Sequence, residues 1–151
     1  MRASHCIAGI VCLAVLGASV REQSVFAQQI SQADSTVARY CAVWGTIDPA
    51  AREAILAEVW AESGEYVDPQ PTRVTGRAAL AAEIVRFQRE NPGSRFRCGT
   101  VQAHHGYVRY AWVMIGADGA ERFQGMDFGE FDPAGRLVRI VSFFGAASLI
   151  K

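Results

Sequence analysis

The sequence has no run of Lys and Arg and no excess of either charge. Its 15 basic and 15 acidic side chains give a formal net charge of 0 at pH 7. Binding to nucleic acid or to an anionic membrane surface depends on clustered positive charge. We therefore expect neither partner. The sequence also lacks internal repeats and low-complexity segments, so nothing in it indicates a repeat architecture.

Candidate metal ligands are few. The chain contains 3 His, and two of them, His104 and His105, are adjacent, so on a strand they would point to opposite faces. A metal site needs more ligands than this pair supplies, and we expect neither a metal nor another cofactor. The pair precedes Gly106 and is typical of a solvated hairpin end, with one His lining a pocket as the alternative.

The N-terminal segment has the features of a secretory signal peptide. Residues 1–5 are short and basic, residues 6–20 are apolar but too few for a comfortable membrane span, and Val25-Phe26-Ala27 offers small residues to a signal peptidase. We expect residues 1–27 to be removed by cleavage after Ala27, which predicts a secreted or periplasmic protein with no membrane span after cleavage. An uncleaved anchor is the alternative.

Cysteine is scarce beyond this segment. Of the 4 Cys, only Cys41 and Cys98 lie outside residues 1–27. A disulfide is possible because such bonds persist in exported proteins. Two buried free thiols are an equally open alternative, since Cys packs as a small apolar residue and only a measured Cα separation could establish the bond.

The rest of the chain is apolar enough for one folded domain, because 50% of all residues are hydrophobic. We expect residues 28–33 to be a flexible leader and residues 34–151 to form the domain. Helical spacing of apolar residues and capping signals predict three helices. These run from Asp34 or Ser35 through Trp44, from Pro49 after an N-cap at Asp48 to Gly64, and from Gly76 to Asn91.

From Arg95 onward the apolar period changes from about 3.6 to 2. Turns at Gly106, at residues 117–119 and at residues 132–135 divide this region into four long antiparallel strands. Both faces of these strands carry apolar side chains, so one face is predicted to meet the helices and the other a partner subunit. The expected homodimer uses outer-face residues Met126, Phe128, Val141 and Phe143.

Three helices followed by a long strand meander predict an α+β fold. In this fold a cone-shaped, curved antiparallel sheet wraps around the three N-terminal helices. A strongly twisted sheet of this kind leaves a cavity open at one end, which is suited to a small apolar molecule.

Asp127 is the most unusual residue of the strand region. It stands in mid-strand between Met126 and Phe128, where alternation aims it inward and no turn explains it. A buried carboxylate of this kind is either a hydrogen-bonded structural group or the working group of a pocket. Glu130 falls on the opposite face and is not expected beside it.

A series of short motifs resembles the SnoaL-like branch of the nuclear transport factor two superfamily, and within it is similar to ketosteroid isomerase. The resemblance covers about Thr36 to Gly145. It rests on Arg39-Tyr40 in the first helix, Asp68-Pro69, Gly76-Arg77, Gly125-x-Asp127-Phe128, Gly135-Arg136-Leu137 and the closing Phe143-Phe144-Gly145.

This resemblance implies catalytic roles for Tyr40, Asp68 and Asp127. By similarity to ketosteroid isomerase, Asp68 would remove a proton next to a carbonyl, and Tyr40 with a neutral Asp127 would donate hydrogen bonds to the developing oxyanion. By similarity to SnoaL-like cyclases, Asp127 would instead be a general acid or base. The structural alternatives are a core-edge Tyr40, a turn carboxylate at Asp68 and a structural hydrogen bond at Asp127.

The expected function is the binding of a small apolar ligand, with isomerisation or cyclisation of a carbonyl-containing substrate. The alternative is a non-catalytic exported module for ligand binding or dimerisation, because this superfamily contains both. Aromatic residues at these spacings are more often core than ligand contacts. The predicted ligand-binding residues are Trp44, Phe96, Tyr110, Trp112, Met114 and Phe144.

Overall fold

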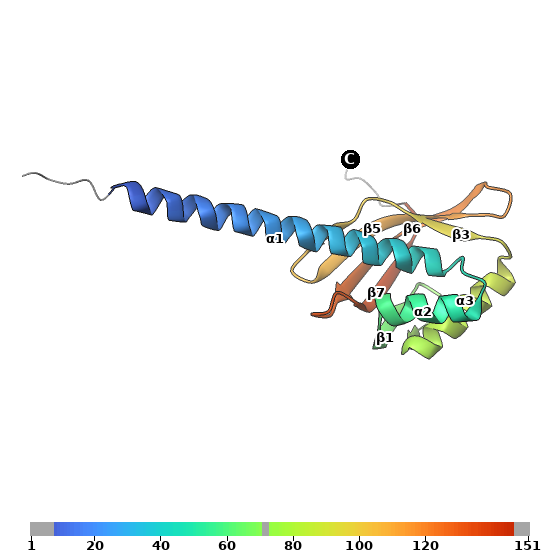
Figure 1. Ribbon diagram of the computed structural model, residues 1–151. Coiled ribbons are helices and arrows are strands. Elements are labelled where there is room, and N and C mark those ends of the chain that lie inside the picture. Colours follow the sequence, from blue (N-terminus) through green and yellow to red (C-terminus); the bar gives the residue numbers. More distant parts are fainter. Residues whose placement is uncertain (1–7, 71–72, 147–151) are drawn as a thin grey trace, which may run out of the picture.

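Three helices and a 7-stranded sheet form the part of the chain that the computed structural model describes, residues 8–70 and 73–146 (Figure 1). The elements are α1 (Ala8–Val43), α2 (Pro49–Val59), β1 (Trp60–Val67), β2 (Arg73–Thr75), α3 (Arg77–Glu90), β3 (Arg95–Cys98), β4 (Gln102–His104), β5 (Tyr107–Ile115), β6 (Glu121–Phe131) and β7 (Leu137–Phe144). The expected basic segment, residues 1–5, and the end of the expected domain, residues 147–151, lie outside the described residues.

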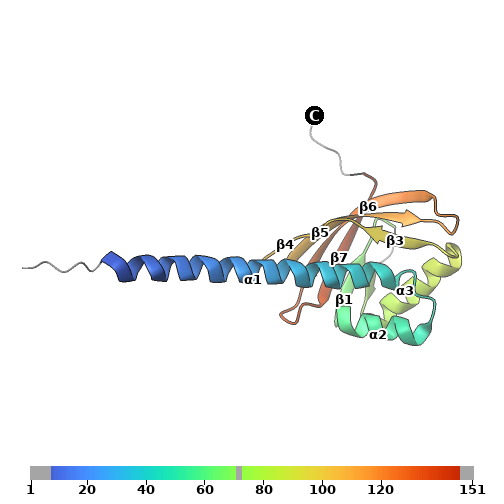
Figure 2. The ribbon, with the colours of Figure 1, turned by 45° about the horizontal axis from the view of Figure 1, so that its top comes forward.

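Helix α1 is longer than the sequence pattern predicts. It does not begin at Asp34 or Ser35, and residues 28–33, expected as a flexible leader, are helical. The reason is local, because residues 18–43 contain neither Gly nor Pro to interrupt the helix. Its N-terminal part projects beyond the sheet (Figures 1 and 2). Within the described residues, no helix has both the length and the hydropathy needed to cross a membrane.

The starts of the other two helices agree with the prediction, but one end does not. Asp48 caps α2, its Oδ1 accepting a hydrogen bond from the Ala51 backbone N–H at 2.7 Å. Helix α2 ends at Val59 rather than Gly64, because the chain continues from Trp60 as strand β1. Helix α3 follows Gly76, whose φ of 93° suits glycine.

The sheet is mixed rather than wholly antiparallel. Its strand order is β2-β1-β7-β6-β5-β3, with β4 also paired to β5, and only the β1–β7 pair is parallel among the described strands. Strands β1 and β7 are separated by several elements in the chain, so no hairpin connection indicates from the sequence that they pair. Five strands rather than four follow Arg95, since the first one is interrupted between Cys98 and Gln102.

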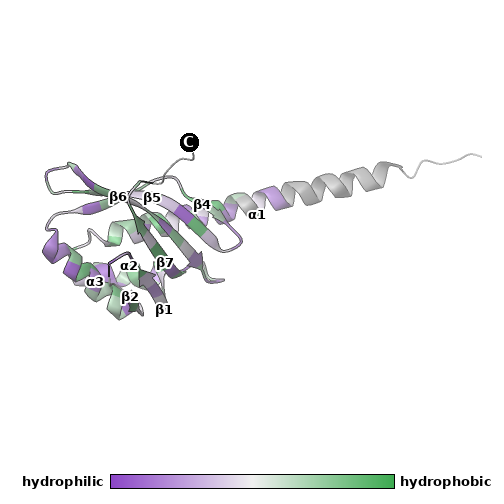
Figure 3. Cartoon of the chain, turned by 180° about the vertical axis from the view of Figure 1, so that it is seen from behind, coloured by the Kyte–Doolittle hydropathy of each residue, from purple (hydrophilic) through white to green (hydrophobic). Residues whose placement is uncertain are grey.

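The helices cover one face of the curved sheet, and the core lies between the two layers (Figure 2). Alternation along β5 buries Val108, Tyr110 and Trp112. Figure 3 shows polar and apolar residues alternating along the strands. On the opposite face Phe128 and Phe143 are exposed to 36% and 52%. The predicted α+β class and inner face are therefore confirmed.

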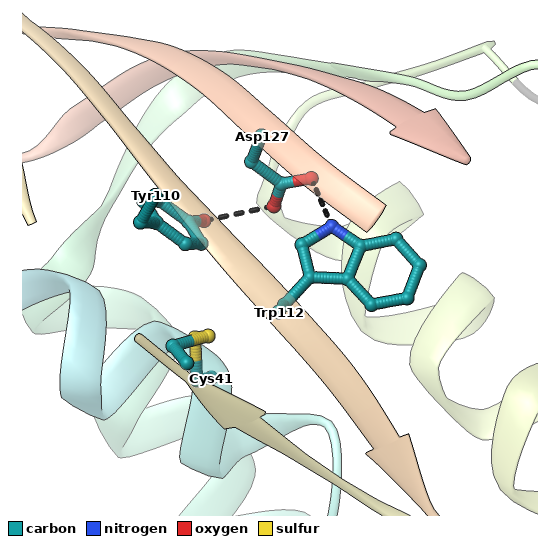
Figure 4. The surroundings of a disulfide bond; sticks show 5 residues. Cys41, Tyr110, Trp112 and Asp127 are labelled. Atoms are coloured by element: carbon teal, nitrogen blue, oxygen red, sulfur yellow. Dashed lines mark hydrogen bonds between the residues drawn. A yellow bond between two sulfur atoms is a disulfide. The ribbon is translucent and has the colours of Figure 1, made fainter. Parts of the chain in front are cut away.

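Cys41 and Cys98 form a disulfide, which decides between the two alternatives left by the sequence. Their Cα atoms lie 6.4 Å apart, within the usual range for such bonds. The bond ties α1 to β3 across a sequence separation of 57 residues. Figure 4 shows Tyr110, Trp112 and Asp127 in the surroundings of this bond. The disulfide therefore links α1 and β3 close to these three side chains.

Candidate active site

A cavity of about 350 Å³ lies between the helices and the inner face of the sheet. This volume falls in the range of small-molecule pockets. Gln70, Glu90 and Phe123 are the exposed residues of the described lining, and they mark where the cavity opens to solvent. Aromatic side chains are the largest group in the lining, namely Tyr40, Trp44, Tyr66, Phe87, Phe96, Trp112, Phe123 and Phe144.

Asp127 lies on the sheet wall of this cavity and is 5% exposed. Trp112 Nε1 donates a hydrogen bond to its Oδ1 at 2.7 Å, and the Tyr110 hydroxyl donates to its Oδ2 at 2.8 Å (Figure 4). Ser142 stands opposite Asp127 on β7. Both carboxylate oxygens are therefore held in fixed positions by neighbouring strands.

Gly125 makes this arrangement possible. It pairs with Trp112 across β5 and β6, and a Cβ at this position would lie 2.3 Å from the Trp112 ring and 2.4 Å from the Phe143 carbonyl oxygen. Neither contact is sterically acceptable. The glycine thus lets the indole lie across the strand and reach Asp127.

Two opposing effects set the pKa of Asp127. Burial raises it from the ordinary 3.8 to about 6, while hydrogen bonds from Ser142, Tyr110 and Trp112 lower it and limit the rise. No cationic side chain contributes among the described residues. A carboxyl group with this pKa is mostly ionised at pH 7 and exchanges its proton readily near neutral pH. These are properties of an acid/base group rather than of a permanently neutral donor.

Tyr40 lines the same cavity, and its hydroxyl is buried. Its side chain is 2% exposed and stacks on Trp60 with ring centroids 5.6 Å apart. The Tyr40 hydroxyl has no hydrogen-bond partner among the described residues. Burial, and then the charge of Asp127, raise its pKa well above the ordinary value, so it remains a phenol. A buried hydroxyl of this kind is available to a ligand.

Asp68 follows β1 directly and lines the cavity with Tyr40 and Asp127. Its Oδ2 accepts a hydrogen bond from the Tyr66 hydroxyl at 3.3 Å, and its Oδ1 accepts one from the Gln70 backbone N–H at 2.9 Å. Partial burial raises its pKa. Tyr40, Asp68 and Asp127, the three residues named from the sequence, therefore line one cavity. Asp68 also accepts a backbone hydrogen bond within the turn that follows β1.

Five of the six predicted ligand-binding residues line the cavity: Trp44, Phe96, Trp112, Met114 and Phe144. Tyr110 is not among the lining residues. Its side chain is 2% exposed and lies behind the carboxylate, to which its hydroxyl donates. The strand face of Tyr110 was predicted correctly, but cross-strand register aims it at Asp127 instead of into the open space.

Sequence reasoning missed several lining residues. Ser142 had a visible signal, because it is the only polar residue on the inward face of a strand that also carries Ile140 and Phe144. Tyr66, two residues before Asp68, had a weaker one. Four further lining residues belong to α3, where nothing in the local pattern singles them out. These are Glu83, Arg86, Phe87 and Glu90.

The adjacent histidines lie elsewhere, in a second cavity of about 370 Å³ beside α1. Their Nδ1 atoms are 3.3 Å apart, so the prediction of opposite faces is wrong. Strand β4 ends at His104, and His105 turns with a φ of 50°, which removes the strand alternation. Within residues 8–70 and 73–146, no group of three or more His, Cys, Asp and Glu forms a metal site.

Fold and site together define a class: α+β domains in which helices and a curved sheet enclose a cavity with many aromatic side chains and a buried carboxylate. Residues 37–140 match the family model of the SnoaL-like domain. The chain belongs to this family, which confirms the resemblance noted from its motifs. A comparison with curated proteins found no match.

Solved structures support the same assignment. A candidate isomerase of the SnoaL-like family from Agrobacterium tumefaciens is 30% identical, with 77% of this chain and 99% of that chain covered and a TM-score of 0.72. A candidate ketosteroid isomerase from Kribbella flavida is 23% identical, over 81% and 84% of the two chains, with a TM-score of 0.58. A Catenulispora acidiphila protein with a ketosteroid isomerase-like fold, solved with trimethylamine, is 16% identical over 73% and 85%, with a TM-score of 0.61.

Proposed function

We propose that this protein binds a small, mainly apolar molecule in the cavity and that Asp127 transfers a proton to or from it. The reaction class is isomerisation or cyclisation of a carbonyl-containing substrate. One observation carries the proposal: Asp127 is a buried carboxylate on the cavity wall, held by Tyr110 and Trp112 and with a pKa raised to about 6. The isomerase description of the Agrobacterium relative agrees with this class.

The chemistry follows from the arrangement of donors and acceptors. Ionised Asp127 takes a proton from the carbon next to a carbonyl, and the electron pair moves to the carbonyl oxygen as an enolate. The unpartnered Tyr40 hydroxyl donates a hydrogen bond to that oxygen. Returning the proton to another carbon completes an isomerisation. Asp68 is the second candidate base, as the family resemblance implies.

One observation favours the alternative of a non-catalytic binding module. Both oxygens of Asp127 and both oxygens of Asp68 already accept hydrogen bonds. A carboxylate engaged in this way can orient a ligand without ever releasing a proton. The experiment below separates the two functions.

Export and pairing are part of the proposal. Ala27 is exposed and lies before Ala33, the first buried residue of α1 among those described, so cleavage after Ala27 leaves the core intact. Phe128 and Phe143 are exposed on the outer face of the sheet, which supports a homodimer through this face.

The test uses proton exchange and isomerisation of a small ketone. Cyclohex-3-en-1-one, a β,γ-unsaturated ketone, is incubated with the protein in D₂O, and NMR follows deuterium uptake and formation of the conjugated enone. We expect Asp127→Asn to lower the catalysed rate by about 100-fold or more, and Asp34→Asn, at an exposed position of α1, to leave it unchanged. Equal rates for Asp127→Asn and the unmodified protein exclude Asp127 as the base. Binding without exchange supports the non-catalytic module.

A further inference from the structure

The cavity lining is strongly unbalanced in charge. Among the described residues it contains four carboxylates, from Asp68, Glu83, Glu90 and Asp127, and one guanidinium, from Arg86. With all of them ionised, the lining carries three more negative than positive charges. A cavity with one sign of charge and low-dielectric walls concentrates ligands of the opposite sign.

The single guanidinium is not available to a ligand. Arg86 Nε donates to Glu83 Oε2 at 2.9 Å, and its Nη1 donates to Glu90 Oε2 at 2.8 Å. Its Nη2 is also bound to Glu83. Anionic ligands are usually held by free Arg or Lys side chains. The described lining has no such group, which argues against a carboxylate or phosphate ligand.

The deep end of the cavity holds a negative charge without a counter-ion. Asp127 is 5% exposed and its hydrogen bonds come from neutral groups, Tyr110 and Trp112. Burying an unpaired carboxylate is costly, and a cation placed beside it would offset that cost. The unpartnered Tyr40 hydroxyl on the same cavity can also accept a hydrogen bond from such a cation.

Aromatic rings that contact one another line part of the cavity. Phe96 stands nearly perpendicular to Trp44, at 79°, and to Trp112, at 89°, with ring centroids 5.8 and 5.3 Å apart. Trp112 is in turn perpendicular to Phe144, at 89°. These rings pack edge to face with one another along the cavity wall, and the negative faces of aromatic rings attract organic ammonium groups.

We propose that the ligand of this cavity is an organic cation, namely an apolar amine in its ammonium form or a quaternary ammonium compound, with Asp127 as its counter-ion. The inference rests on the proposed function in using the same cavity and the same carboxylate. It adds the charge of the substrate. The aromatic rings contact the alkyl groups of the ammonium, and Asp68 and Glu90 attract it at the open side.

Three probes of matched shape test the inference. Choline, 3,3-dimethylbutan-1-ol and 3,3-dimethylbutanoate share a branched head and carry positive, zero and negative charge, respectively. Binding is followed by fluorescence of Trp44 and Trp112, which line the cavity, and by calorimetry. We expect choline to bind at least about tenfold more tightly than the alcohol, and the butanoate not to bind. Equal affinity for choline and the alcohol, or no binding of any probe, overturns the proposal.

Variants identify the counter-ion. Asp127→Asn should abolish the preference for choline over the alcohol, whereas Asp34→Asn should preserve it. A preference that survives Asp127→Asn contradicts the role given to this residue. The probe series on the unmodified protein does not depend on either variant folding. Exchange on the neutral ketone tests proton transfer independently of ligand charge, so failure of the charge inference and failure of the proposed function give different results.

Discussion

At Asp127 the balance between desolvation and hydrogen bonding gives a group that changes protonation near neutral pH. Desolvation alone would favour the neutral acid, but Trp112 donates only, and its bond to Oδ1 favours the ionised form. Gly125 supports this balance indirectly by making room for the indole. The reactivity of one residue is therefore set by neighbours on two strands.

This balance predicts a stability effect that depends on pH. The pKa of Asp127 in the folded protein, about 6, lies above its ordinary value of 3.8, so between these values the folded state binds more protons than the unfolded state. The unfolding free energy should then fall by up to about 3 kcal/mol as pH rises from 4 to 8. Asp127→Asn is neutral throughout, so its stability relative to the unmodified protein should rise by that amount over the same range.

Urea denaturation at a series of pH values measures this difference. Asn can keep the contacts, because its oxygen accepts from Trp112 and its amide donates to the Tyr110 hydroxyl. Asp34→Asn, on the exposed face of α1, is the control and should show little change with pH. A stability difference between Asp127→Asn and the unmodified protein that is constant from pH 4 to 8 would contradict the pKa assigned to Asp127.

At the scale of elements, the disulfide joins the two parts of the cavity wall that the sheet does not connect. Helix α1 supplies Tyr40, strand β3 supplies Phe96, and the Cys41–Cys98 bond links the two elements. A covalent link of this kind restricts the unfolded chain and also holds the wall in place.

Removing the disulfide should therefore affect both stability and binding. We expect the double variant Cys41→Ala and Cys98→Ala to lower the unfolding free energy by about 2–4 kcal/mol, and to weaken binding of whichever probe the unmodified protein holds. Denaturant unfolding and fluorescence titration measure the two effects. Reduction of the unmodified protein is the matched comparison and should reproduce the loss of stability. Unchanged stability in both cases would show that the bond is not structural.

At the scale of the whole molecule, the outer face of the sheet has no covering layer within the described chain. Phe128 and Phe143 are exposed there, and Tyr107 stacks on Phe128 with ring centroids 5.7 Å apart. The helices occupy the other face (Figure 2). An exposed aromatic face of this kind is typical of a subunit interface.

The proposed homodimer can be tested by light scattering at micromolar concentration. We expect the unmodified protein to be a dimer, and Phe128→Ser combined with Phe143→Ser to be a folded monomer, because the pair supplies the apolar centre of the interface. Val85→Ser, at a residue on α3 that is 44% exposed, is the control and should remain dimeric. A monomeric unmodified protein would refute the dimer.

Much of the site was predictable because strand alternation is a local property. The positions of Trp112 and Asp127 on the inward face followed from counting along their strands. The start of α1 was not predictable in the same way, because a capping residue such as Asp34 has no effect when a helix-forming segment precedes it. The predicted direction of the His105 side chain was wrong for a different reason. The strand ends before this residue, so strand alternation does not apply to it.

The sequence by itself determined the α+β class, the family and the faces on which Tyr40 and Asp127 lie, because these depend on short-range periodicity and motif order. Only the tertiary structure decided that Cys41 bonds to Cys98 and that Tyr110 lies behind Asp127. It also decided that the described part of the cavity lining is acidic and has no unpaired cationic side chain. These features join segments far apart in the chain, and packing, rather than local sequence, sets the distances between them.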